Sequence, residues 1–232
     1  MKCIGIIGAM EEEISRLKIK MKDVRIVKKA SMDFYEGYLL GKKVIVVRSG
    51  VGKVNAGLCA QILTDMFSVD AILNTGIAGS LNAEIEIGDI VVSTDVVQHD
   101  VDAGAFGYRK GQIPQLPVFS FQADEKLRRL AVESCHEVNP EIQVFEGRIA
   151  SGDQFICEKE KKDDISGEFS AYAVEMEGAA IGQAACLNEV PFLIIRAISD
   201  KADGSARMDY DVFEKAAIEH SVRLTQRMIE RL

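Results

Sequence analysis

The segment Ala171–Asp200, AYAVEMEGAAIGQAACLNEVPFLIIRAISD, constrains the fold more than any other part of the chain. Ala171–Val174 is short and apolar, which predicts a strand, and the alanine-rich stretch Gly178–Leu187 predicts a buried helix. Pro191 ends that helix, and Phe192–Ile195 is an unbroken run of β-formers, as in a central parallel strand. The segment is therefore expected to form a strand–helix–strand unit of an α/β sheet.

Charged residues follow both of these strands. Glu175 and Glu177 come after the first strand, and Arg196, Ser199 and Asp200 come after the second. In open α/β sheets ligands bind at the carboxyl ends of the strands. A buried carboxylate costs several kcal/mol unless it is paired. The acids therefore either form a site, or cap helices and pair with Arg196, and both interpretations stay open at this point.

Strand-like and helix-like segments alternate along the rest of the chain. Further strands are predicted at Cys3–Gly8, Phe34–Leu40, Val44–Arg48, Ala71–Asn74, Ile87–Ser93 and Phe145–Ser151. Further helices are predicted at Ala9–Leu17, from Lys53 to about Phe67, and at Asp124–Glu137, Glu158–Phe169 and Tyr210–Leu232. The alternation predicts one α/β domain over residues 1–232, with a mixed, mostly parallel central sheet and helices on both faces. A hairpin turning at Gly41-Lys42 interrupts it, and the long loop that begins at Asp100 is expected to serve function or an interface.

Composition excludes several classes of protein. The net charge is -8, so a nucleic-acid surface is not expected, because phosphate contacts need clustered Lys and Arg. No apolar run approaches the roughly 20 residues that cross a bilayer. The five cysteines form no CxxC pair, which favours reduced thiols and a cytoplasmic location. The three histidines do not cluster, and no GxSxG motif is present, so we expect no metal, no cofactor and no serine nucleophile.

Two glycine-rich segments, Ser49–Lys53 (SGVGK) and Thr75–Ser80 (TGIAGS), are predicted turns after strands. Neither fits the Walker pattern or the dinucleotide-binding pattern, so each is either a simple backbone turn or a ligand loop. Glu13 lies in an acidic run after the first strand, where the helix dipole alone could favour it. Separated carboxylates without a metal also suit glycosidic-bond chemistry, in which one activates water and one protonates the leaving group.

Motifs spread in order over nearly the whole chain resemble the bacterial 5′-methylthioadenosine/S-adenosylhomocysteine nucleosidases, of the purine nucleoside phosphorylase superfamily. The matching motifs are IGIIGAMEEE (Ile4–Glu13), SGVGKVNA (Ser49–Ala56), NTGIAGS (Asn74–Ser80), GDIVVS (Gly88–Ser93), HDVDAGAFGY (His99–Tyr108), SGDQFI (Ser151–Ile156), VEMEGAA (Val174–Ala180) and RAISD (Arg196–Asp200). The resemblance implies the three-layer architecture of nucleoside phosphorylases. It also implies hydrolysis of the bond between adenine and a 5′-thio-substituted ribose, in methionine salvage and the recycling of S-adenosylmethionine by-products.

Roles for three acids follow from the same resemblance. Asp200 would protonate N7 of adenine, Glu177 would hold the ribose hydroxyls and oppose the positive charge on the sugar, and Glu13 would take a proton from the attacking water. An ordinary Asp is ionised at neutral pH, so the role of Asp200 requires a more basic carboxyl or a proton relayed on binding. Arg196 would lie near the water and Glu177.

The resemblance implies further substrate contacts. Phe155 and Ile156 would frame adenine, and Met176 would contact the ribose. The remaining expected contacts on the same chain are Met10, Val51, Ile77, Ala78, Gly79, Glu175, Ser199 and Tyr210. Phe106 and Pro114 would come from a neighbouring subunit, so we expect a homodimer in which the loop at residues 100–117 completes the partner's site.

Water and phosphate remain to be distinguished as nucleophiles. A phosphate needs cations and backbone donors, whereas Glu11, Glu12 and Glu13 follow the first strand. This favours a hydrolase, although Arg48 beside the SGVGK turn favours the alternative of a phosphorylase.

Ile77 replaces a small hydroxyl residue common in the family. The small residues Ala103-Gly104 in the covering loop leave the 5′-group preference open, including a futalosine-type substrate.

Overall fold

The computed structural model describes residues 1–202 and 206–232, with side chains described outside 203–214. The strands are β1 (Cys3–Gly8), β2 (Lys22–Lys29), β3 (Met32–Leu39), β4 (Lys42–Arg48), β5 (Ala71–Ser80), β6 (Ile90–Gln98), β7 (Phe121–Gln122), β8 (Val144–Ser151), β9 (Ala171–Glu175) and β10 (Phe192–Asp200). The helices are α1 (Glu11–Lys20), α2 (Lys53–Phe67), α3 (Glu125–Val138), α4 (Lys159–Phe169), α5 (Gly178–Leu187) and α6 (Ala206–Arg231), with a short 3₁₀ turn at Gly104–Phe106. The predicted strand–helix–strand unit is present as β9, α5 and β10.

One sheet contains all of these strands. β5, β10, β6, β8 and β9 pair in succession, and β9 pairs back onto β5, so these five strands close into a ring. β1, β4, β3 and β2 extend the sheet outward from β5, and β7 pairs with β6. The mixed α/β fold is confirmed. Among the described pairings five are parallel and five antiparallel, which is more antiparallel pairing than strand–helix alternation predicts.

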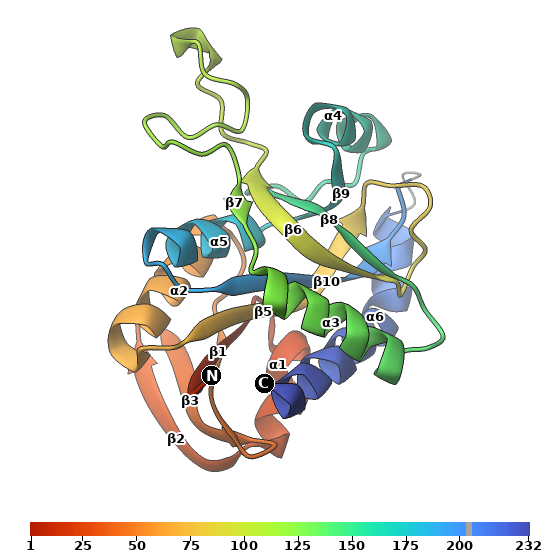
Figure 1. Cartoon of the computed structure of the whole chain (residues 1–232). Helices are drawn as coiled ribbons and strands as arrows, with labels where there is room; N and C mark the ends of the chain where they lie inside the picture. The colour runs from red at the N-terminus through yellow and green to blue at the C-terminus, as the bar shows by residue number, and fades with distance from the viewer. Residues whose placement is uncertain (203–205) are drawn as a thin grey trace.

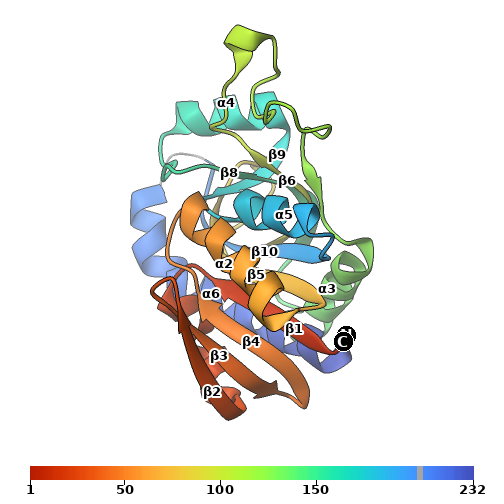
Figure 2. The same ribbon diagram turned by 90° about the vertical axis from the view of Figure 1, so that its left-hand side faces the viewer.

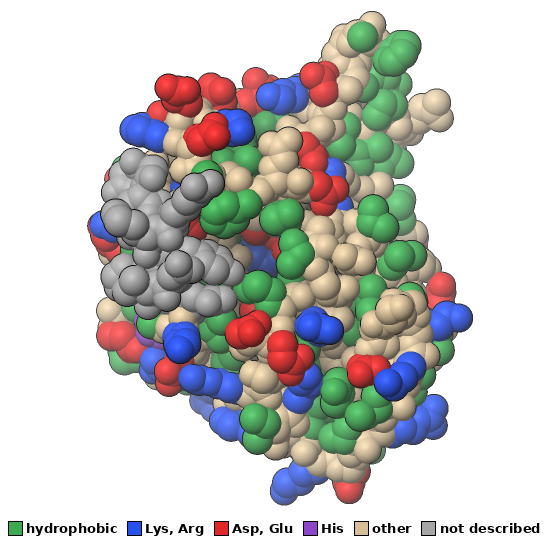
Figure 3. Space-filling model, turned by 180° about the vertical axis from the view of Figure 1, so that it is seen from behind, with side chains coloured by type: hydrophobic (Ala, Val, Ile, Leu, Met, Phe, Trp, Pro, Cys, Tyr) green, Lys and Arg blue, Asp and Glu red, His purple; other side chains and the backbone are tan. Residues whose placement is uncertain are grey.

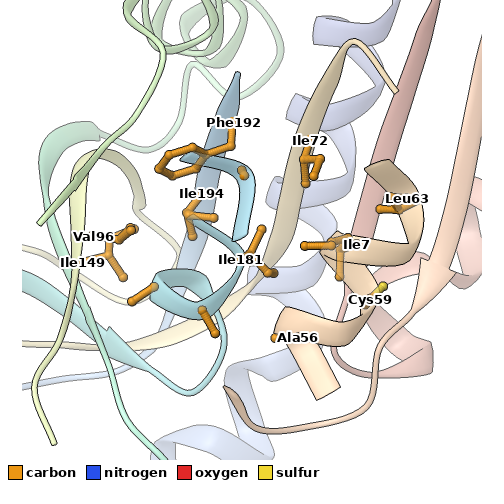
Figure 4. Packing of buried hydrophobic residues seen from close by; sticks show 14 of the residues in the cluster. Ile7, Ala56, Cys59, Leu63, Ile72, Val96, Ile149, Ile181, Phe192 and Ile194 are labelled. Carbon is orange, nitrogen blue, oxygen red and sulfur yellow. The ribbon is translucent and has the colours of Figure 1, made fainter. Parts of the chain in front are cut away.

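Helices cover both faces of the sheet, as Figures 1 and 2 show. On one face α2 and α5 pack side by side and bury side chains such as Ala56, Cys59 and Ile181 against β-branched residues of the sheet (Figure 4). On the other face α1, α3 and α6 enclose a second apolar cluster that includes Leu17 and Leu127. The inner strands of the sheet thus form a middle layer that is buried on both sides, as their continuous apolar sequences require.

The strands β5, β6 and β10 run well beyond their predicted ends. β6 was predicted at Ile87–Ser93 and forms Ile90–Gln98. β5 continues through TGIAGS to Ser80, and β10 continues through RAISD to Asp200, because the two strands pair in parallel along nearly their whole lengths. TGIAGS is therefore a strand and not a turn, and Arg196 lies within a strand and not past its end. Pairing to a neighbour outweighs the weak β-propensity of the two glycines.

The strand β2 and the position of the hairpin turn also differ from prediction. β2 was not predicted, because its sequence KDVRIVKK lies at the edge of the sheet and all but Val27 of it is exposed, so the strand lacks an apolar pattern. The hairpin turns one residue earlier than predicted, at Leu40 and Gly41, which both have positive φ as a two-residue turn requires. Residues 100–120 are otherwise irregular and project from the body of the molecule (Figures 1 and 2).

Candidate active site

A cavity of about 520 Å³ opens where β1, β5, β9 and β10 end. Its lining residues are Ala9, Met10, Glu13, Val51, Ile77, Ala78, Gly79, Phe155, Val174, Glu175, Met176, Glu177, Ser199 and Asp200. Figure 3 shows one face of the molecule, with Lys and Arg interspersed among Asp and Glu and with charged atoms visible in a hollow near its middle. The cavity combines an apolar wall with four carboxyl groups, which is the composition expected of a site for a small polar ligand.

Glu13 lies in the first turn of α1, and its carboxylate satisfies the backbone around it. Oε2 accepts hydrogen bonds from the amides of Ala9 (2.7 Å) and Met10 (3.0 Å), and Oε1 accepts one from Ile77 (3.3 Å). Burial raises the pKa of Glu13, while the Arg196 guanidinium and the three amides oppose that rise. Glu13 thus both caps the helix and faces the cavity, so the two interpretations of the acidic run are compatible.

Glu177 lies at the start of α5, and its Oε1 accepts the amide of Gly52 at 2.8 Å. Gly52 has a φ of 99°, a conformation that favours glycine, so the SGVGK turn directs an amide at this acid. Burial, followed by the neighbouring charge of Glu175, raises the pKa of Glu177 to about 7, with Arg196 acting against the rise. The carboxyl of Glu177 therefore changes charge near neutral pH.

Glu175 is the most completely bonded acid of the site. Its carboxylate pairs with Arg196, accepts the hydroxyl of Ser151, and accepts the amides of Glu177 (3.1 Å) and Gly178 (2.7 Å). Arg196 also donates to the side chain of Asn74 and to its neighbouring backbone carbonyl. The predicted pairing of an acid with Arg196 is present, and it falls to Glu175, which leaves Glu177 facing the cavity.

Asp200, at the end of β10, has a partner that sequence reasoning missed. Lys162 of α4 places its Nζ 2.6 Å from Oδ2 of Asp200, and Ser199 donates its hydroxyl to Oδ1 at 3.0 Å. The helix itself was predicted, at Glu158–Phe169, but no role was predicted for Lys162. A signal was available, because Lys162 shares a helical face with Ile165 and Phe169, both of which are buried.

Two glycines of TGIAGS allow the acids to approach the β5 backbone. A Cβ at Gly76 would lie 2.5 Å from Oε1 of Glu13, and one at Gly79 would lie 2.8 Å from Oδ2 of Asp200. Both distances are shorter than a van der Waals contact, so any side chain here would displace a carboxylate. The motif is therefore the floor of the site and not a phosphate-binding loop.

The structure brings together twelve of the predicted residues as cavity lining: Met10, Glu13, Val51, Ile77, Ala78, Gly79, Phe155, Glu175, Met176, Glu177, Ser199 and Asp200. Arg196 and Ile156 are buried without lining the cavity. Phe106, which is 84% exposed, and Pro114 lie on the projecting loop and not at this chain's cavity. The side chain of Tyr210 lies outside the described residues, and Ala9 and Val174 line the cavity without having been predicted.

A family model described as the phosphorylase superfamily matches residues 3–232. The chain belongs to the phosphorylase superfamily. Among curated members, a 5′-methylthioadenosine/S-adenosylhomocysteine nucleosidase of Bacillus licheniformis is 42% identical over 230 residues, which is 99% of each chain. The family that the motifs predicted is thereby confirmed.

Solved structures of this superfamily agree closely in fold. The nucleosidase of Neisseria meningitidis in complex with methylthio-immucillin-A has a TM-score of 0.95 and 39% identity, with complete coverage of both chains. Futalosine hydrolase of Helicobacter pylori has a TM-score of 0.93 and 37% identity, covering 100% of this chain and 98% of that one. The fold alone therefore does not distinguish these two substrate classes.

The described residues that line the cavity include no Lys or Arg. Arg48, the residue that favoured a phosphate nucleophile, is exposed and does not line the cavity. The end of β1 instead presents Glu13, and a buried carboxylate there repels a phosphate dianion. Among the described residues, none of the helices combines the length and the hydropathy of a membrane span.

Proposed function

We propose that the chain hydrolyses the N-glycosidic bond of 5′-methylthioadenosine and S-adenosylhomocysteine, releasing adenine and the 5′-thioribose product. The observation that carries this proposal is that Glu13, Glu177 and Asp200 line one cavity whose described lining contains no cation for phosphate. The names of the full-length relatives support the same reaction class.

Asp200 is assigned to the adenine end of the cavity. As the glycosidic bond breaks, its electron pair moves into the purine, and a proton delivered to N7 makes the base a better leaving group. Ser199 holds one oxygen of the Asp200 carboxyl. Phe155, which lines the cavity and is half exposed, is suited to stack on the base, and the neighbouring Ile156 is buried.

Glu177 and Glu13 are assigned to the sugar. The departing base leaves a ribosyl cation, which an ionised Glu177 stabilises while it accepts hydrogen bonds from the ribose hydroxyls. Glu13 takes a proton from the water that attacks the anomeric carbon. Met176 contacts the ribose, and Glu175 keeps Arg196 neutralised beneath the site.

A second copy of the chain is proposed to complete the 5′ end of the site. Met10 and Val51 form the apolar wall there, and half of the Val51 side chain is exposed. Exposed apolar residues continue along α2 and α5 at Val54, Leu58 and Leu187, more than a single surface residue explains. In a homodimer these residues would be covered, and Phe106 and Pro114 on the projecting loop would cover the partner's 5′-thio group.

A product assay tests the proposal. Purified protein is incubated with methylthioadenosine, S-adenosylhomocysteine or futalosine, each with and without phosphate, and the free base is measured. We expect adenine from the first two substrates at the same rate in both buffers. Strict phosphate dependence with a sugar 1-phosphate product would establish a phosphorylase instead. Turnover of futalosine alone would establish the other substrate class found among the structural relatives.

A further inference from the structure

The ion pair between Lys162 and Asp200 is the most deeply buried charge pair at the site. The Lys162 side chain is 1% exposed and the Asp200 side chain 2%, with Nζ 2.6 Å from Oδ2. Nζ also donates to the backbone carbonyl of Lys201. Lys162 does not line the cavity, so it reaches a ligand only through Asp200.

The position of Lys162 on α4 is otherwise that of an apolar residue. The same helical face carries Ile165 and Phe169, which pack into a small apolar cluster beneath β8 and β9. Replacing a buried ion pair by apolar residues often leaves the stability of a fold unchanged or raises it. Stability alone therefore does not explain why this position carries a charged pair. A methionine would fill the same space, which leaves the ammonium group itself to be explained.

We propose that Lys162 is the positioning residue for Asp200 and the source of the proton that Asp200 delivers to the leaving base. The inference rests on the proposed function, because it takes Asp200 as the group beside N7. The ammonium group of Lys162 contacts the carboxyl of Asp200 directly, so a proton can pass between the two without an intervening group. Among the described residues the Ser199 hydroxyl also donates to that carboxyl, and Lys162 is the charged donor in contact with it.

The proton transfers balance. When the bond between the anomeric carbon and N9 breaks, its electron pair goes to the purine, and N7 takes a proton from the Asp200 carboxyl. That carboxyl receives a proton from the Lys162 ammonium, which becomes a neutral amine. The attacking water loses one proton to Glu13 as its oxygen bonds to the anomeric carbon. The protein therefore gives one proton and gains one, and exchange with solvent restores both groups.

The test is a double-mutant cycle on the full chain with methylthioadenosine as substrate. The variants are Lys162→Met, Asp200→Asn and the two combined. We expect Lys162→Met to lower kcat by about 10²- to 10³-fold with KM changed less than threefold, because general acid catalysis contributes on that scale. Lys162 acts only through Asp200, so the double variant should have the kcat of Asp200→Asn alone. The matched control is Lys161→Met, an exposed lysine one position earlier on α4, which should keep wild-type kcat.

Three results overturn the inference. One is a kcat for Lys162→Met within fivefold of wild type. Another is a double variant whose loss is the product of the two single losses, as independent structural damage would give. The third is a rise in KM that accounts for the loss. If Lys162→Met alone does not fold, the kcat of Asp200→Asn is compared with that of the double variant, which leaves neither Lys162 nor Asp200 as an unpaired buried charge. A lower kcat in the double variant would then refute the inference. Absence of any nucleosidase activity in the wild type would instead refute the proposed function.

Discussion

Replacing Glu13 with glutamine separates its two tasks, the cap of α1 and the proposed general base. The carboxylate accepts amides from Ala9 and Met10 on one oxygen and the amide of Ile77 on the other. Glutamine keeps the shape but has one acceptor oxygen, and it cannot take a proton from water. The substitution therefore retains most of the local structure and removes the chemistry.

The effect on stability follows from the hydrogen bonds. The favourable amide orientation keeps oxygen towards Ala9 and Met10 and turns the NH₂ group towards the Ile77 amide, which then lacks an acceptor. A buried amide without a partner costs about 1–3 kcal/mol. Burial of the Glu13 carboxylate is itself unfavourable, as its raised pKa shows, so its replacement by a neutral amide offsets part of that cost. We expect the midpoint of thermal unfolding to fall by less than about 10 °C, since about 1 kcal/mol corresponds to ~2–4 °C at this size.

The effect on activity should be much larger. A positioned general base contributes about 10²- to 10⁴-fold, or roughly 3–5 kcal/mol of the activation barrier. We expect kcat for Glu13→Gln on methylthioadenosine to fall within that range while KM stays within threefold, measured by adenine release and by calorimetric binding of adenine. Glu12→Gln is the matched control, because Glu12 is the exposed neighbour in the same first turn and does not line the cavity.

A variant that folds, binds adenine and retains kcat within fivefold of wild type would show that Glu13 serves only as a helix cap. The same conclusion would follow if Glu12→Gln and Glu13→Gln lost equal activity. Loss of binding together with loss of stability would mean that the cap, and not the proton transfer, limits the site.

Further predictions concern Glu177, Gly76 and Phe106. Glu177 must be ionised to oppose the ribosyl cation, so kcat/KM should rise as pH increases through about 7, a rise that Glu177→Gln should abolish. Its raised pKa means that the folded state binds more protons, so thermal stability should decline from about pH 5 to 8, and less steeply in Glu177→Gln. Gly76→Ala should lower kcat at least tenfold by displacing Glu13, whereas Gly57→Ala on α2, with open space at its Cβ, should retain full activity. Phe106→Ala should raise KM for methylthioadenosine severalfold while kcat with a saturating substrate stays near wild type; an unchanged KM would remove the projecting loop from the site.

The main features of the fold were predictable because apolar periodicity reports burial directly. Phe192–Ile195 is buried on both faces of the sheet and was predicted as a central strand for that reason. The extension of β10 to Asp200 was not predictable, because RAISD has no β-pattern of its own and is held extended by pairing with β5. β2 was not predicted for a different reason, because an exposed edge strand has no apolar face that the sequence could indicate.

The candidate site was predictable where its residues lie in recognisable motifs. Glu13, Glu177 and Asp200 were located by their places after apolar runs, and the motifs supplied most of the lining. Lys162 was missed because KEKKDDISGEF is dominated by charges, and the helical spacing of Lys162 to Ile165 and Phe169, which indicates the buried face of α4, was not used. A buried counter-ion is specified by the packing of a distant element, and local sequence carries little of that information.

The buried acids outnumber the buried cations at the cavity. Four buried carboxyl groups and two buried cations meet at or behind the cavity: Glu13, Glu175, Glu177, Asp200, Arg196 and Lys162. Two of the acids are neutralised by direct ion pairs. Among the described residues Glu13 and Glu177 have no ion-pair partner, and these two have raised pKa values. A positive charge about 4 Å from one carboxylate gains roughly 4 kcal/mol at an effective dielectric constant of 20. Two buried carboxylates without a cationic partner lower the stability of the fold at high pH, and under the proposed function the same two groups act on the ribosyl cation and the attacking water.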